Sequence, residues 1–200
     1  MRVTVFDYGA GNLHSLVKAL AGSGREVAVV TDAAELAAAE LLVLPGVGAF
    51  PQAAGRLAPA RAALRDALRD GLPCVGICLG MQLLFERSDE GEGEGLALIE
   101  GPVTRLRARR VPHIGWNAVS GDDPMLAASG LELGYFANGF AGRPADASCV
   151  TAWTDHDGDR FPSIVRAARA VGVQFHPEKS SAAGVRLLHA ALEGVLVEVR

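Results

Sequence analysis

Residues 72–87 read L-P-C-V-G-I-C-L-G-M-Q-L-L-F-E-R, and this stretch decides the fold because it joins an apolar run to a helical pattern. The run at 72–77 has no alternating polar residues, which is typical of a strand buried on both faces of a parallel sheet. A helix is predicted over residues 81–87. Between them lies G-I-C-L-G at 76–80, with a glycine two places before Cys78 and another two places after it. We therefore expect Cys78 at a sharp turn from strand to helix.

This turn gives Cys78 the surroundings of a nucleophile. In a G-x-S-x-G elbow the turn exposes the nucleophile, and larger side chains at the flanking positions would crowd it. A helix N-terminus favours negative charge, so it lowers the pKa of a thiol, which is about 8.5 when free. The alternative is that Cys78 is only a small buried residue, as we expect for Cys74 within the strand. The flanking glycines favour the nucleophile.

A candidate base follows another apolar strand, at 171–175, where His176, Pro177 and Glu178 come in succession. His176 is placed to take the thiol proton and to return it to a leaving amine, while Glu178 orients the ring and stabilises its charged form. Taken alone, H-P-E is also an ordinary turn before a helix, with Glu178 favourable near the helix start. The pairing with Cys78 favours catalysis.

The sequence P-G-V-G at 45–48 follows a third apolar strand, at 41–44. The carboxyl ends of parallel strands meet at one edge of a sheet. We therefore expect this turn to lie beside Cys78 and His176.

Backbone N–H groups near these glycines predict an oxyanion hole, formed by Gly46, Val47 and Leu79, for the tetrahedral intermediate of acyl transfer. A phosphate-binding loop is the alternative, here and at residues 9–12. Neither segment has the third glycine or the G-K-[ST] ending of such loops. Acyl transfer is the better prediction.

The wider pattern predicts an α/β protein. Apolar runs alternate with helical patterns over the first half, as in β-α-β units, whereas strands separated by turns in the second half predict antiparallel or mixed pairing. We interpret the acidic, glycine-rich segment 88–95 as a flexible solvated loop and expect one domain over residues 1–200. Strands are predicted at 2–6, 26–30, 41–44, 72–77, 103–106, 111–119, 133–138, 148–154, 164–168 and 171–175, and helices at 12–22, 32–38, 59–70, 81–87 and 182–196.

The composition narrows the class of protein. The 200 residues are 50% hydrophobic and 21% charged, as in ordinary globular proteins, with a net charge of −4. A protein with this net negative charge does not attract a phosphate backbone or an anionic membrane electrostatically, so we expect neither nucleic acid nor membrane as a partner. Three cysteines without a C-x-x-C pair argue against a disulfide framework and a structural zinc site. We expect no metal, no cofactor and a cytoplasmic location.

These motifs resemble those of the class I, triad-type glutamine amidotransferases. The resemblance is carried by G-I-C-L-G-M-Q at 76–82 and Q-F-H-P-E-K-S at 174–180, and it covers nearly the whole chain. The stretches D-Y-G-A-G-N-L at 7–13, P-G-V-G-A-F at 45–50 and P-H-I-G-W-N at 112–117 resemble members of the family that serve histidine biosynthesis.

The resemblance implies a flavodoxin-like fold: a mixed, mainly parallel sheet with helices on both faces and an added antiparallel region. It also implies that L-glutamine is hydrolysed to glutamate and ammonia through a glutamyl thioester on Cys78. Ammonia would then pass, within a heterodimer, to a barrel-shaped cyclase subunit that forms imidazole glycerol phosphate and an aminoimidazole carboxamide ribotide.

Two further sets of residues take roles from the same resemblance. Where relatives read Y-F-V-H-S-Y, this chain has Y-F-A-N-G-F at 135–140, which removes a histidine, a hydroxyl and a phenol from the glutamine pocket but leaves the backbone. The expected glutamine-binding residues are Gly48, Gln82, Asn138 and Gly139, and the expected cyclase interface comprises Asn12, His113, Trp116, Asn117 and Lys179.

Two other functions remain open. A sibling glutaminase serving pyridoxal phosphate or anthranilate formation would share the triad but lack P-H-I-G-W-N and the lysine at 179. A non-catalytic binding module on the same fold is suggested by the altered segment 138–140, and it would show no thiol reactivity.

Overall fold

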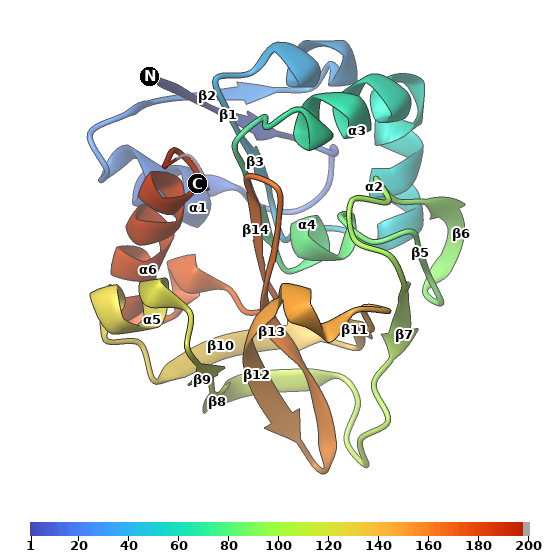
Figure 1. The fold of residues 1–200 in the computed structure, drawn as a ribbon, viewed down its shortest axis with the longest axis vertical. Helices are drawn as coiled ribbons and strands as arrows, with labels where there is room; N and C mark the ends of the chain where they lie inside the picture. Colours follow the sequence, from blue (N-terminus) through green and yellow to red (C-terminus); the bar gives the residue numbers. More distant parts are fainter. Residues whose placement is uncertain (198–200) are drawn as a thin grey trace.

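The computed structural model describes residues 1–197, and an eight-stranded sheet runs through this part of the chain (Figure 1). Its order is β2-β1-β3-β4-β14-β13-β12-β9. All residues of β3, β4 and β14 are buried, as expected for strands covered on both faces. The parallel half consists of β2 (Glu26–Val30), β1 (Arg2–Phe6), β3 (Leu41–Leu44), β4 (Cys74–Ile77) and β14 (Ala170–Val173).

Antiparallel strands continue the sheet beyond β14. They are β13 (Asp159–Ala167), β12 (Val150–His156) and β9 (Ser120–Gly121). The β12–β13 hairpin extends past the carboxyl ends of the parallel strands (Figure 1). The predicted α/β fold, with a mainly parallel sheet and an added antiparallel region, is confirmed.

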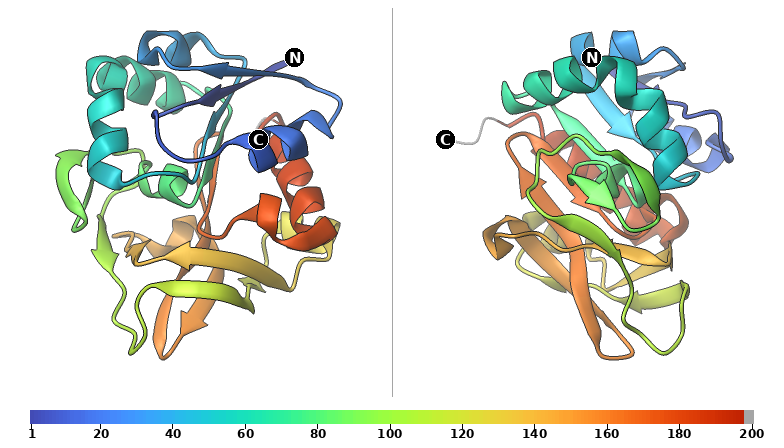
Figure 2. Two further views of the ribbon diagram at one scale, coloured as in Figure 1. Left: turned by 180° about the vertical axis from the view of Figure 1, so that it is seen from behind. Right: turned by 90° about the vertical axis from the view of Figure 1, so that its right-hand side faces the viewer.

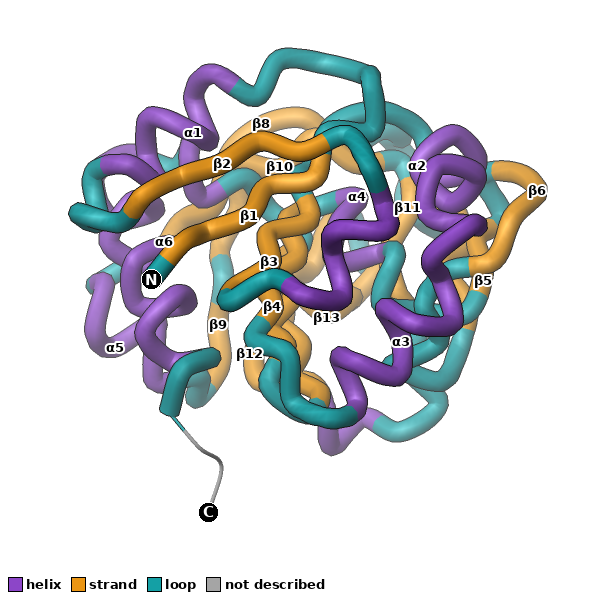
Figure 3. The backbone as a smooth tube through the Cα atoms, turned by 90° about the horizontal axis from the view of Figure 1, so that it is seen from above, coloured by secondary structure: helices purple, strands orange, loops and turns teal. Residues whose placement is uncertain are grey.

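Helices cover both faces of the sheet (Figures 1 and 3), and each face has its own apolar cluster. Successive residues of β3 divide between the clusters: Leu41 and Val43 belong to one, Leu42 and Leu44 to the other. This division follows from the alternation of side chains along a strand. On one face lie α1 (His14–Ala21), α5 (Pro124–Ser129) and α6 (Ser181–Gly194), and on the other α2 (Phe50–Leu57), α3 (Arg61–Arg69) and α4 (Leu79–Gln82).

Four short 3-10 helices lie in the connections: η1 (Ala33–Ala38), η2 (Ala58–Ala60), η3 (Ala147–Cys149) and η4 (Pro177–Lys179). Within residues 1–197, every helix is too short or too polar to cross a bilayer.

Two smaller sheets complete the described chain. Strands β10 (Leu133–Asn138) and β8 (His113–Ala118) form an antiparallel ribbon across the carboxyl end of the parallel strands (Figure 2). The ribbon is tied to the main sheet where the His176 N–H donates to the Tyr135 carbonyl at 2.8 Å. The other sheet, in order β11-β7-β5-β6, contains β11 (Phe140–Gly142), β7 (Pro102–Arg105), β5 (Arg87–Ser88) and β6 (Gly91–Glu94).

The helix predicted over residues 81–87 is wrong in its position and length. Helix α4 begins at Leu79 and ends at Gln82. Beyond it, the carbonyls of residues 83–86 accept hydrogen bonds from the N–H groups of residues 95–98, at distances from 2.7 to 3.1 Å. Because these acceptors are taken by a distant segment, the helix does not continue.

The prediction of a flexible loop at 88–95 is also wrong. Strands β5 and β6 form a hairpin there, exposed to solvent but packed on α2. The Glu90 carboxylate accepts a hydrogen bond from the Phe50 N–H at 2.8 Å, at the start of α2. A Cβ on Gly91 would lie 2.6 Å from Pro51 Cγ, so only glycine permits this close approach.

Helix α2 is absent from the sequence-based predictions, and the helix predicted over 59–70 is α3, which begins at Arg61. Pro51 stands in the first turn of α2, where its missing N–H costs nothing because those donors have no partner within the helix. A proline at this place is therefore compatible with a helix over Phe50–Leu57.

We predict that Gly80→Ala destabilises the fold, because a Cβ there would lie 1.9 Å from the Leu44 carbonyl oxygen of β3. The expected loss is about 2–3 kcal/mol or more in the free energy of unfolding, measured by urea denaturation. Gly55→Ala is the matched control, since its Cβ meets nothing within 4 Å, and a gain of about 0.5–1 kcal/mol is expected from helix propensity. Equal stability of the two variants would contradict the close packing of β3 against α4.

Candidate functional site

Cys78 lies at the turn from β4 to α4, with φ at 47° and ψ at −104°. A positive φ is strained for a residue with a side chain, and such strain is often found at functional sites. Hydrogen bonds hold the turn on both sides: the Cys78 N–H donates to the Val173 carbonyl at 2.7 Å, and the Cys78 carbonyl accepts from the Gln82 N–H at 3.1 Å. Gly76 has no room for a Cβ, which would lie 2.7 Å from the Gly80 oxygen.

His176 and Glu178 form a buried pair directly after β14. His176 Nδ1 lies 2.8 Å from Glu178 Oε1, and the two side chains are only 5% and 7% exposed. Burial lowers the pKa of His176, but its interactions with Cys78 and Glu178 outweigh burial and raise that pKa from 6.5 to about 10. The ring is therefore held in its charged form at neutral pH.

The turn after β3 brings the three segments together. A Cβ on Gly46 would lie 2.9 Å from Cys78 Cβ and 2.9 Å from His176 Cε1. Glycine is thus required where the backbone passes between the cysteine and the histidine. The expected meeting of these residues at the carboxyl edge of the sheet is present in the structure.

A small cavity of about 100 Å³ opens beside Cys78. All four residues predicted to bind glutamine line it. Asn138 Nδ2 donates to the Phe140 carbonyl at 2.9 Å, while its buried Oδ1 has no hydrogen-bond partner within residues 1–197. The lining consists of Gly46, Gly48, Cys78, Leu79, Gln82, Glu90, Ala137, Asn138, Gly139 and Phe140.

The three predicted oxyanion residues differ in their positions. Gly46 and Leu79 line the cavity. Val47 packs instead over Gly11, where an added Cβ would lie 2.6 Å from Val47 Cβ. If Val47 acts at the cavity, it would therefore do so through its backbone N–H group and not through its side chain.

Two residues of this site are absent from the sequence-based predictions. Gln174 is fully buried and contacts both Cys78 and Gln82. Gln174 directly follows β14, and ligands of such sheets bind at the carboxyl ends of the strands, so this position is a signal that could have identified it. Glu90 lines the cavity from the β5–β6 hairpin, and its interpretation as part of a loop concealed it.

Three of the predicted interface residues are exposed at the same end of the molecule. Trp116 is 53% exposed, and Asn12 and Lys179 are also exposed. Helix η4, which contains Lys179, contacts both α1 and β10. Trp116 of β8 packs against Tyr135 of β10 with ring centroids 6.0 Å apart.

His113 and Asn117, the other two residues predicted at the interface, are less exposed than the first three. The His113 ring is buried between Phe136 and His156, at centroid distances of 4.8 and 3.9 Å. Burial and the neighbouring His156 lower the pKa of His113 to about 4. Asn117 is half-buried, and its Nδ2 donates to the Asp155 carbonyl at 2.8 Å. Both side chains make contacts within the protein, and their place at the interface stays a prediction.

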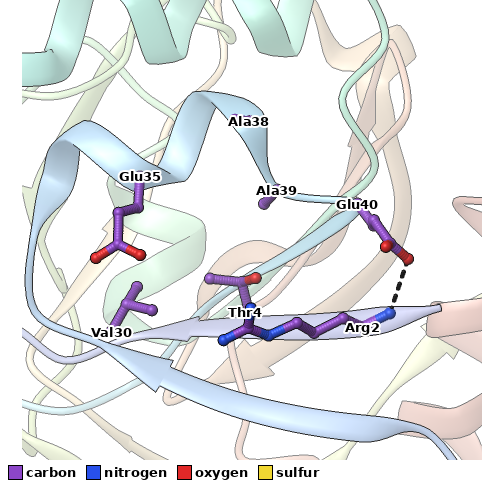
Figure 4. Close-up of a pocket in the computed structure, with 7 residues that line it drawn as sticks. All are labelled: Arg2, Thr4, Val30, Glu35, Ala38, Ala39 and Glu40. Atoms are coloured by element: carbon purple, nitrogen blue, oxygen red, sulfur yellow. Dashed lines mark hydrogen bonds between the residues drawn. The ribbon is translucent and has the colours of Figure 1, made fainter.

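A larger pocket, of about 310 Å³, lies at the opposite end of the parallel strands (Figure 4). There the Arg2 N–H donates to Glu40 Oε2 at 2.8 Å. Ligands of open α/β sheets bind at the carboxyl ends of the strands, and this pocket lies at the amino end of β1. Its lining consists of Arg2, Thr4, Val30, Glu35, Ala38, Ala39 and Glu40, which include no nucleophile paired with a base.

Comparison with known proteins agrees with this geometry. The class I glutamine amidotransferase family matches residues 4–192. Two relatives are named imidazole glycerol phosphate synthase subunit HisH. The relative from Halobacterium salinarum is 43% identical and covers 93% of this chain and 90% of its own. The relative from Symbiobacterium thermophilum is 45% identical, and the match covers 94% of this chain and 91% of the relative.

A solved structure described as a glutamine amidotransferase has the same fold, with a TM-score of 0.76 at 22% identity over 98% of this chain and 99% of that one. The chain belongs to the class I glutamine amidotransferases. Within that class, its family is that of the HisH subunits of imidazole glycerol phosphate synthase.

We predict that Glu178→Gln lowers the pKa of His176, because the amide removes a negative charge from Nδ1. In the wild type the raised value means that the charged ring stabilises the fold fully below about pH 6.5, and that this contribution is lost as the pH rises through about 10. NMR titration of the ring nitrogens should show the midpoint falling in the variant. Glu132→Gln, an exposed carboxylate, is the control. An unchanged midpoint would refute the pairing.

Proposed function

We propose that this protein is the glutaminase subunit of an imidazole glycerol phosphate synthase in histidine biosynthesis. It hydrolyses L-glutamine to glutamate and ammonia, and a cyclase subunit consumes the ammonia. The observation that carries the proposal is the convergence of Cys78, His176 and Gly46 beside a small polar cavity. The relatives named as subunits of this synthase support the pathway.

The geometry supports hydrolysis in two stages. The Cys78 thiolate attacks the side-chain amide carbon of glutamine, and the charged His176 ring donates its proton to the departing ammonia. The neutral ring then takes a proton from water, which attacks the glutamyl thioester and releases glutamate. Glu178 holds Nδ1 throughout, so that the opposite ring nitrogen serves the reaction.

The cavity supplies recognition of the substrate. The backbone N–H groups of Gly46, Val47 and Leu79 would stabilise the oxyanion. The Glu90 carboxylate, which already accepts one backbone N–H, is suited to the α-ammonium group of glutamine. Gly48, Gln82, Asn138 and Gly139 would hold the rest of the substrate.

The exposed end of the molecule near η4 is suited to the cyclase. Ile114 and Trp116 on β8 are 66% and 53% exposed, and Lys179 adds a cation nearby. Large exposed apolar side chains surrounded by polar ones are typical of interaction sites. Docking there, together with Asn12, would make a heterodimer that covers the end of the molecule where Cys78 lies.

The chain would act as one domain, because its two apolar clusters share the two faces of one sheet. Its three cysteines are free thiols, which fits a reducing compartment such as the cytoplasm. The proposed chemistry uses side chains, backbone N–H groups and water, so we propose no cofactor.

Cys78→Ala should abolish glutamine-dependent synthesis by the complex and leave ammonia-dependent synthesis near normal, because the cyclase needs only ammonia. Both rates are measured by following formation of imidazole glycerol phosphate. Cys149→Ala, which removes a cysteine remote from the cavity, is the control and should retain both activities. Loss of both activities in a folded Cys78→Ala complex would show that this division of labour is wrong.

Trp116→Ala should weaken binding of the cyclase by about tenfold or more, because exposed aromatic anchors often dominate an interface. Titration calorimetry with the cyclase measures the dissociation constant. Val29→Ala is the control, since Val29 is 46% exposed on β2, the edge strand on the opposite side of the main sheet from β12, which β8 contacts. Equal affinity of the two variants for the cyclase would contradict the assignment of Trp116 to the interface.

A further inference from the structure

We propose that Gln174 is a positioning residue of the glutaminase, which holds the Cys78 sulfur and the Gln82 side chain in one fixed arrangement. This inference rests on the proposed function. It starts from a buried amide that joins the nucleophile to a residue of the substrate cavity.

Gln174 makes two contacts across the site. Its Nε2 lies 3.6 Å from Cys78 Sγ and donates to it, and its Oε1 accepts from Gln82 Nε2 at 3.2 Å. The Gln174 side chain is 0% exposed. Burying an amide is costly unless its polar atoms are paired, so both contacts contribute to keeping it there.

The network fixes which end of each amide faces the sulfur. Gln82 Nε2 also donates to the Phe140 carbonyl, at 3.0 Å. Since a nitrogen with two hydrogens must face two acceptors here, Gln174 must turn its oxygen towards Gln82 and its nitrogen towards Cys78. The opposite orientation would bring the two nitrogens together and place an oxygen against the sulfur.

This orientation has a consequence for the nucleophile. A donor directed at the sulfur stabilises the thiolate over the thiol, and it also restricts rotation of the Cys78 side chain. The strained turn places the backbone of Cys78, whereas Gln174 places its sulfur.

A second consequence concerns the substrate. Both hydrogens of Gln82 Nε2 are used within the protein, so only Gln82 Oε1 remains to meet glutamine. An amide oxygen can accept a hydrogen bond from the α-ammonium group of glutamine, whereas it would repel the α-carboxylate. By accepting the second hydrogen of this amide, Gln174 helps to leave an acceptor, and not a donor, to meet glutamine.

The test compares Gln174→Met, which keeps the length of the side chain without its donor, with Gln174→Glu, which places an acceptor against the sulfur. Ser163→Ala is the matched control, because Ser163 is fully buried on the adjacent β13 and its hydroxyl has no partner within residues 1–197. Alkylation of Cys78 by iodoacetamide is followed against pH by peptide mass spectrometry. The half-buried Cys149 is the internal reference.

We expect the alkylation midpoint of Cys78 to rise by about one pH unit in Gln174→Met, more in Gln174→Glu, and not at all in Ser163→Ala. The charged groups around Cys78 are His176, its partner Glu178, and Glu90 across the cavity, and none of them changes in these variants. A purely structural role would lower stability without moving the midpoint. Unchanged midpoints in both Gln174 variants would overturn the proposal.

Kinetics of the complex give a second readout. Loss of the sulfur contact should lower kcat for glutamine hydrolysis by about tenfold, and release of Gln82 should raise KM, while ammonia-dependent synthesis is unchanged. Unchanged kcat and KM in the Gln174 variants would contradict a positioning role for Gln174.

A measurement on the wild type serves if the variants do not fold. The side-chain amide resonances of Gln174 should follow the titration of Cys78 and lose that response in Cys78→Ala, and a flat response would overturn the inference. Failure of the proposed function is distinguishable. It would appear as a wild-type complex that releases no ammonia from glutamine and forms no adduct with an electrophilic glutamine analogue.

Discussion

The Cys78 backbone adopts a conformation that side chains disfavour, and the centre of the molecule is built to hold it there. A residue at this φ costs about 1–3 kcal/mol, which neighbouring structure must offset. The offset comes from the hydrogen bond to the Val173 carbonyl and from the burial of β4 between β3 and β14. A strand at the edge of the sheet would have only one such neighbour and would let the turn relax.

The same constraint explains why distant glycines are needed. The turn packs α4 against β3, so a Cβ on Gly80 would collide with the Leu44 oxygen. It also brings Cys78 close to the turn after β3, where a Cβ on Gly46 would collide with the side chains of both Cys78 and His176. The sheet therefore determines how close Gly46, Cys78 and His176 lie to one another. Strands β3, β4 and β14 are paired side by side, so the residues that follow them emerge together at one edge of the sheet.

A residue of the site can be predicted from the sequence when it stands in a short motif beside a recognisable strand or helix. Cys78, His176 and Gly46 each follow an apolar run and stand in a short motif, so parallel pairing alone placed them together. Gln174 carried a periodic signal of the same kind, but an amide in an apolar strand is also common as a buried structural residue.

Glu90 and the end of α4 had no local signal at all. The β5–β6 hairpin is held by contacts with α2, and α4 does not continue past Gln82 because residues 95–98 take the carbonyls of residues 83–86. Such effects belong to tertiary structure, and a charge-rich, glycine-rich segment read alone predicts a loop. The burial of the His113 ring is an effect of the same kind, because its neighbours in sequence are exposed while Phe136 and His156 stack on the ring.

The segment at 138–140 lines the cavity and contributes backbone acceptors to the hydrogen bonds around it. The Phe140 carbonyl accepts hydrogen bonds from both Gln82 and Asn138, and the Gly139 carbonyl accepts from the Leu106 N–H at 2.9 Å. These acceptors belong to the backbone, and they stay in place whichever side chains the segment carries. The hydrogen bond from Gln82 to Phe140 therefore depends on the path of this backbone rather than on the side chains of the segment. Because Gln82 also donates to Gln174, and Gln174 donates to the Cys78 sulfur, the same backbone path bears on the surroundings of that sulfur.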